Sequence, residues 1–123
     1  MTDSLRILTV DDSVSMRALL KHALASNGFN VVQAEDGQEA LDWLAINDID
    51  VIITDINMPR LDGFGLIEAL RACERHRDRP ILVLSTESSE DKKSRARAAG
   101  ATGWIVKPFD ADKLVAAVRR VAH

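Results

Sequence analysis

The sequence predicts an α/β fold in which helices cover both faces of a parallel five-stranded sheet. Short β-branched runs alternate about five times with longer stretches of helical periodicity, and this alternation is the signature of a doubly wound parallel sheet. Two of the runs, Val51–Ile53 and Ile81–Leu84, are apolar throughout. Such runs are typical of strands that are buried on both faces.

The predicted strands are all short and are bounded by polar or glycine residues. They are Leu5–Val10, Asn30–Ala34, Val51–Thr54, Ile81–Leu84 and Trp104–Val106. Connections between successive parallel strands are expected to be right-handed.

Amphipathic helices are predicted between these strands and after the last one. The first has its apolar residues between Met16 and Leu24 and stops at Asn27-Gly28, and the next three are expected over Gln38–Ile46, Phe64–Cys73 and Ser89–Ala99. The last begins from an N-cap at Asp110 and has an apolar stripe that ends at Val121. The fourth helix differs from the others, because its only apolar residues are Ala96, Ala98 and Ala99. A helix that buries so little is expected to be locally mobile.

Charged residues directly follow three of the predicted strands. The first strand runs into Asp11 and Asp12, and the third runs into Asp55. The fifth strand ends in Lys107. Open α/β sheets place their ligand sites outside the carboxyl ends of the strands, at the point where the strand order reverses. The flavodoxin-like order 2-1-3-4-5 makes the first and third strands neighbours, so it would bring the aspartates together there.

This arrangement suits phosphoryl transfer to a side chain. Clustered carboxylates repel one another and need a cation, and Mg²⁺ suits a shallow cluster because it keeps several waters. Lys107 is not a metal ligand, so it is expected to neutralise a negative group such as a phosphoryl group. An aspartate can itself be the nucleophile and form an aspartyl-phosphate. Ser85, at the end of the fourth strand, would offer a hydroxyl to the same group.

A set of short motifs extends from Arg6 to the last helix and covers nearly the whole chain. The motifs are Val10-Asp11-Asp12-Ser13, Asp55-Ile56-Asn57-Met58-Pro59, Asp62-Gly63, Ser85-Thr86-Glu87 and Lys107-Pro108-Phe109. In this order and at these strand ends they resemble the receiver domains of two-component response regulators. More narrowly, they resemble the CheY-like stand-alone chemotaxis regulators.

The resemblance implies a phosphorylation site that contains a metal. Asp55 would be the phosphoacceptor and would attack the phosphohistidine of a sensor histidine kinase. The implied Mg²⁺ ligands are Asp12, Asp55, the backbone carbonyl of Asn57 and, through a water molecule, Asp11. Lys107 would be the conserved lysine of the family, and the family pattern makes its bond to Pro108 cis.

The resemblance also implies a switch. In the family the hydroxyl at the position of Ser85 moves toward the phosphoryl group, and the aromatic residue at the position of Trp104 turns inward. The face made by the fourth helix, fifth strand and fifth helix then changes its partners. The residues that would modulate this chemistry are Asn57, Thr86 and Glu87.

Two positions depart from the usual family pattern. Thr86 stands where many relatives have alanine, and its extra bulk is expected to slow the water that attacks the phosphoryl group. Trp104 stands where Tyr or Phe is more common, and its indole N–H needs a partner when it is buried.

Composition narrows the possible functions. The length of 123 residues suits a single domain. A formal net charge of −3 does not indicate a basic surface that would bind nucleic acid. No apolar stretch approaches a membrane span, and the N-terminus lacks the order of a signal peptide. The single Cys73 excludes an internal disulfide, and the histidines His22, His76 and His123 are expected to be ordinary surface residues. We therefore expect a monomeric, cytoplasmic receiver domain over residues 1–123, with no output domain.

The expected function is that of a phosphorylation-activated signalling protein, which is no enzyme beyond its own phosphoryl transfer and autodephosphorylation. Its expected partners are a histidine kinase and either a flagellar motor switch protein or another output protein. One alternative is a phosphate sink for a shared chemotaxis kinase. Another is a haloacid-dehalogenase-type phosphatase, although that class needs Asp-x-Asp where this chain has Asp11-Asp12-Ser13.

Overall fold

Strands and helices alternate strictly along residues 5–122, which are the residues that the computed structural model describes. The strands are β1 (Arg6–Val10), β2 (Asn30–Ala34), β3 (Val51–Thr54), β4 (Ile81–Ser85) and β5 (Gly103–Val106). The helices are α1 (Val14–Ala25), α2 (Gly37–Leu44), α3 (Gly63–Ala72), α4 (Glu90–Ala99) and α5 (Ala111–Val121). Every predicted element is present, with boundaries shifted by one or two residues at most ends.

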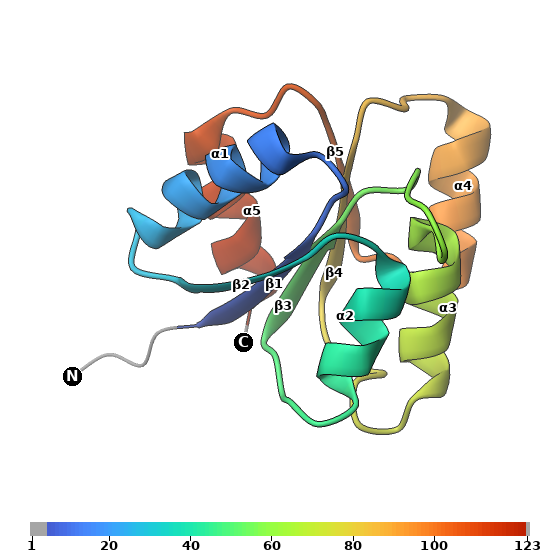
Figure 1. Cartoon of the computed structure of the whole chain (residues 1–123). Helices are drawn as coiled ribbons and strands as arrows, with labels where there is room; N and C mark the ends of the chain where they lie inside the picture. Colours follow the sequence, from blue (N-terminus) through green and yellow to red (C-terminus); the bar gives the residue numbers. More distant parts are fainter. Residues whose placement is uncertain (1–4, 123) are drawn as a thin grey trace.

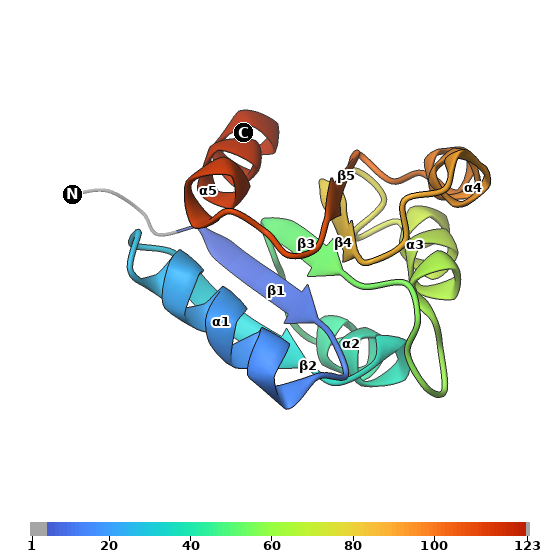
Figure 2. The ribbon, with the colours of Figure 1, turned by 90° about the horizontal axis from the view of Figure 1, so that it is seen from above.

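The strands form one parallel sheet in the order β2-β1-β3-β4-β5, as predicted. Helices α1 and α5 cover one face, and α2, α3 and α4 cover the other (Figure 1). The view from above shows the sheet as the middle of these three layers (Figure 2). This is the flavodoxin-like architecture, and its reversal of strand order lies between β1 and β3.

Each face of the sheet buries its own apolar cluster. Successive side chains of a strand point to opposite faces, so Ile52 joins the cluster beneath α2 and α3, whereas Ile53 joins the cluster beneath α1 and α5. All residues of β3 and β4 are buried. This burial on both faces explains why these two strands are apolar without alternation.

Each helix begins at a residue whose side chain accepts a hydrogen bond from the backbone of the first turn. These N-cap residues are Ser13, Asp36, Asp62, Ser89 and Asp110. Such caps satisfy backbone N–H groups that have no partner within the helix. The predicted cap at Asp110 is confirmed.

Helix α4 is weakly anchored, as its sequence predicts. Ala96 is its only buried residue. The guanidinium of Arg95 lies 4.0 Å from the centre of the Phe64 ring on α3, a cation–π contact that adds little where solvent reaches it. The helix ends at Gly100, whose φ of 116° suits glycine.

The prediction that all three histidines lie on the surface is wrong for His76. This residue is 2% exposed, and its Nε2 lies 2.9 Å from the carbonyl oxygen of Leu44. The carbonyl groups in the last turn of a helix have no partner within the helix, so the ring caps the end of α2. His22 is exposed as expected, and His123 lies outside the described residues.

Candidate functional site

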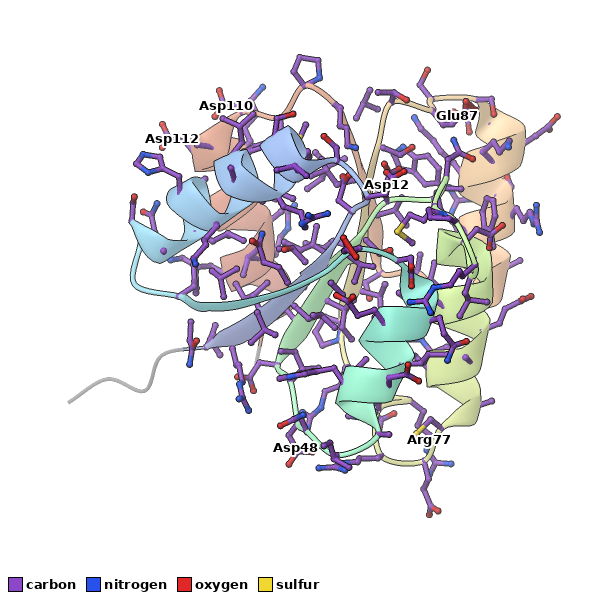
Figure 3. The ribbon with its side chains drawn as sticks, viewed as in Figure 1. Asp12, Asp48, Arg77, Glu87, Asp110 and Asp112 are labelled. Carbon is purple, nitrogen blue, oxygen red and sulfur yellow. The ribbon has the colours of Figure 1, made fainter. Side chains whose placement is uncertain are left out.

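The aspartates that follow β1 and β3 come together at the carboxyl edge of the sheet. The two strands are paired in register, and the backbone N–H of Asp55 donates to the carbonyl oxygen of Val10 over 2.9 Å. One carboxylate oxygen from each of Asp11, Asp12 and Asp55 lies within 4.8 Å of the others. Asp11 is buried, whereas Asp12 is exposed at this edge, where it is labelled in Figure 3. The predicted acidic cluster is therefore present.

Lys107 bridges two of these carboxylates. Its Nζ donates to Oδ2 of Asp11 and to Oδ2 of Asp55, each over 2.8 Å, and its side chain is only 10% exposed. Burial alone would lower the pKa of Lys107, but the two carboxylates outweigh it and hold the pKa above its ordinary value. The predicted cis bond between Lys107 and Pro108 is also present.

The carboxylates differ in how many of their oxygens are held. The second oxygen of Asp11 accepts from the backbone N–H of Ser13 over 2.9 Å, and that of Asp55 accepts from the backbone N–H of Ile56 over 2.6 Å. Within residues 5–122 the carboxylate of Asp12 accepts no hydrogen bond, and neither does the carbonyl of Asn57. Both are free to bind a metal.

The donor set fits Mg²⁺. Its members are carboxylate oxygens and a backbone carbonyl, which are the ligands that hard divalent cations prefer. Because Asp12 is exposed, a bound ion would keep water molecules in its coordination shell, as Mg²⁺ usually does. Asp12, Asp55 and the carbonyl of Asn57 would hold the ion, which would supply charge neutralisation for an incoming anion.

The predicted switch residues are connected through the backbone of Glu87. Ser85 is fully buried, and its Oγ accepts from the N–H of Glu87 over 3.2 Å. The indole N–H of Trp104 donates to the carbonyl oxygen of Glu87 over 3.0 Å. The loop that follows β4 is thus held by the hydroxyl on one side and by the indole on the other. Thr86, between the two, is exposed.

Two supporting contacts were not predicted. The side chain of Arg17 donates to the backbone carbonyl of Asp11 over 2.7 Å. Arg60, whose φ is 65°, donates to both carboxylate oxygens of Asp36 over 2.9 and 3.1 Å, and this pairing lowers the pKa of Asp36. The ion pair joins the loop that carries Asn57 to the start of α2. No local sequence pattern predicts this ion pair, because its two residues lie 24 positions apart in the chain.

The arrangement matches a known family. A model of the response regulator receiver domain matches residues 7–119. The chain belongs to this family. Membership accounts for the order of the sheet, for the acidic cluster at its reversal point and for the lysine that follows β5.

Relatives of this receiver domain include proteins with different roles. It is 38% identical over 118 residues to the chemotaxis protein CheY of Pseudomonas aeruginosa, and the match covers 95% of each chain. It is 45% identical to the transcriptional regulatory protein PrrA of Mycobacterium tuberculosis, but covers only 48% of that protein. The structure of chemotaxis protein CheY4 from Vibrio cholerae has a TM-score of 0.92 and 43% identity, with 97% of this chain and 99% of that chain covered. None of the helices described is long and apolar enough to cross a membrane.

Proposed function

We propose that this receiver domain accepts a phosphoryl group on Asp55 from the phosphohistidine of a histidine kinase. The observation that carries the proposal is the ammonium of Lys107, which lies 2.8 Å from Oδ2 of both Asp55 and Asp11. In the transfer, the P–N bond of the phosphohistidine breaks while a bond forms between phosphorus and a carboxylate oxygen of Asp55. The leaving histidine keeps the electron pair of the broken bond. Lys107 can then move its hydrogen bond from the carboxylate to a phosphoryl oxygen.

A Mg²⁺ ion held by Asp12, Asp55 and the carbonyl of Asn57 would supply charge neutralisation for this transfer. The domain's own contribution is positional: the N–H of Ile56 holds one oxygen of Asp55, which fixes the orientation of the carboxylate. Beyond this self-modification and the later hydrolysis of the acyl phosphate, we propose no enzymatic activity.

The signal would leave the site through Ser85. Movement of the hydroxyl toward a phosphoryl oxygen would draw it away from the N–H of Glu87, from which it now accepts a hydrogen bond. The carbonyl of Glu87 accepts a hydrogen bond from the indole of Trp104. A shift of this loop would therefore also change the hydrogen bond that holds the indole. The same loop leads into α4, which buries only Ala96.

Replacing Thr86 with alanine is expected to shorten the lifetime of the phosphorylated protein. Thr86 adjoins Ser85 and is exposed, so we place its side chain in the path of the attacking water. Loss of this screening is expected to speed hydrolysis between about two- and tenfold, which corresponds to at most about 1.4 kcal/mol in the barrier. The rate is measured as decay of the acyl phosphate after the phosphodonor is removed.

Thr86→Val is the matched control, because it keeps the bulk and removes only the hydroxyl. It should decay at nearly the wild-type rate. Equal acceleration in both variants would assign the effect to the hydroxyl, and slower decay in Thr86→Ala would contradict the steric explanation.

We propose that the output partner docks on the face formed by α4, β5 and α5. Two grooves flank Trp104 there, with volumes of about 310 and 380 Å³. The first is bordered by Lys93 and Arg97, and the second by Lys113 and Arg120. Cationic rims around an aromatic centre favour a partner segment that combines acidic and apolar side chains.

A flagellar motor switch protein is the first candidate for this partner, and the full-length similarity to chemotaxis proteins supports it. A phosphate sink that drains a shared kinase is the alternative, because it would need no such docking. The domain would act as a monomer in either role. The haloacid-dehalogenase-type phosphatase gains no support, since the receiver family already accounts for an aspartate nucleophile.

Binding to isolated motor switch protein distinguishes the two roles. We expect phosphorylated protein to bind more tightly than unphosphorylated protein, measured by fluorescence anisotropy with and without a small phosphodonor. Reversing the charge of Lys113, on the rim of one groove, should weaken binding without changing phosphorylation. Rapid loss of label from the shared kinase without any binding would instead support the phosphate sink.

A further inference from the structure

A cavity lined by charged residues lies at the opposite end of the sheet from the acidic cluster. Its volume is about 340 Å³, and it is formed where α3, the loop to β4, the residue before β5 and the end of α5 meet. Figure 3 shows Arg77 at this lower end and Asp12 at the upper edge. The charged residues that line the cavity are Arg71, Arg77, Asp78, Arg79 and Arg120. One carboxylate therefore accompanies four guanidinium groups.

These four guanidinium groups form no ion pair with any of residues 5–122. Other arginines of the chain do pair, since Arg60 contacts Asp36 and Arg75 contacts Asp48. Like charges gathered around one cavity repel each other, and Asp78 is the one carboxylate among the lining residues that opposes this repulsion. A bound anion would remove this repulsion.

Arg71 links the segments that form the cavity. Its Nε and Nη2 donate to the carbonyl of Gly100 over 3.0 and 2.8 Å, and its Nη1 donates to the carbonyls of Arg77 and Arg79 over 2.7 Å each. Burial lowers the pKa of Arg71, although Asp78 partly opposes this effect. Because carbonyl groups leave its charge uncompensated, Arg71 both fixes the loop and keeps the cavity positive.

We propose that this arginine cavity binds a small anion that carries a di- or triphosphate group, as ADP does. Guanidinium groups bind phosphate oxygens in a bidentate manner and are preferred over lysine for this task. The volume lies within the range of about 300 to 1,000 Å³ that is typical of small-molecule sites. Four positive charges around one cavity favour a ligand with more than one negative charge.

The site would lie beside the proposed docking face but apart from the phosphoacceptor. Two residues of the arginine cavity also line the grooves that flank Trp104: Thr102 lines the first groove and Arg120 the second. A bound anion would thus change the charge at the margin of the docking face. The proposal does not depend on phosphorylation of Asp55, which belongs to the opposite edge of the sheet.

The test is a calorimetric titration of the full chain with ADP, in the presence of a chelator so that no metal binds at the aspartates. We expect saturable binding that inorganic pyrophosphate competes away and adenosine does not. Arg77→Gln and Arg79→Gln should each raise the Kd about tenfold, the value of one charge-assisted hydrogen bond. The side chains of both residues make no hydrogen bond within residues 5–122, so their loss should leave the fold intact.

Lys21→Gln is the matched control, because it removes one positive charge from the exposed surface of α1. It should bind ADP like the wild type. No heat with millimolar ADP, or an equal loss of affinity in Lys21→Gln, would overturn the proposal. All three variants should still be phosphorylated by a small phosphodonor, so failure of the arginine cavity and failure of the Asp55 assignment are told apart.

Discussion

Asp55→Asn is expected to reduce phosphorylation by a small phosphodonor and Mg²⁺ to background. The amide has no carboxylate oxygen that can attack phosphorus. It has nearly the shape of the carboxylate, and its oxygen can still accept from the N–H of Ile56 or from Lys107. The variant should therefore stay folded while the reaction is lost. Intact-protein mass spectrometry after incubation with acetyl phosphate measures the added phosphoryl group.

Asp42→Asn is the matched control for this experiment, since Asp42 is exposed on α2 and away from the cluster. It should be phosphorylated to the wild-type extent. An acyl phosphate that persists on Asp55→Asn would show that another carboxylate is the acceptor. Equal loss in Asp42→Asn would point to a general effect of charge on the donor.

Lys107→Met is expected to lower the free energy of unfolding by about 2–3 kcal/mol in the absence of Mg²⁺. Breaking a buried ion pair by removing one partner costs about 3–5 kcal/mol, and the lower value reflects the partial solvent access of Asp55, whose side chain is 12% exposed. Adding Mg²⁺ should reduce the deficit, because the ion supplies the missing positive charge. Urea denaturation with and without Mg²⁺ measures both effects.

The pH dependence of this difference follows from the raised pKa of Lys107. A lysine whose pKa is higher in the folded state than in the unfolded state contributes its full stabilisation below the ordinary lysine value of about 10.4. The contribution is lost as the pH rises through the raised pKa. The gap between wild type and Lys107→Met should thus stay constant near neutral pH and close only in strong alkali.

Lys113→Met, an exposed change on α5, provides the comparison. It should alter the free energy of unfolding by less than about 0.5 kcal/mol. If Lys107→Met were as stable as wild type without Mg²⁺, the ammonium would not be compensating the carboxylates. A deficit that Mg²⁺ leaves unchanged would place the lost stability in packing.

The sequence predicts the acidic cluster because the geometry of a parallel sheet brings residues at strand ends together. Once β1 and β3 are neighbours, Asp11, Asp12 and Asp55 have to meet at one edge. Lys107 follows from the same rule, since its strand ends on that edge. The need of the Trp104 indole for a partner is also predictable, but the choice of Glu87 depends on the path of a loop.

Contacts that depend on the path of a loop cannot be predicted from the positions of strand ends. The bidentate ion pair between Arg60 and Asp36 depends on the positive φ of Arg60 itself. Residues other than glycine rarely adopt this backbone conformation, so the sequence does not predict it. The burial of His76 depends on how the loop after α3 packs beneath the end of α2. Neither position carries an apolar period or a motif that would reveal its environment.

The sparse anchoring of α4 has a consequence for the balance between the two states of the domain. A helix that has one buried alanine and two cation–π contacts with Phe64 would lose little when it moves, so we expect a displaced arrangement to lie only a few kcal/mol above the resting one. Such a gap populates the minor state at about 0.1–10% before any signal arrives. Under the proposed function, phosphorylation would only have to shift an equilibrium that already exists. Unphosphorylated protein should accordingly retain a small basal output, set by how tightly Ala96 packs.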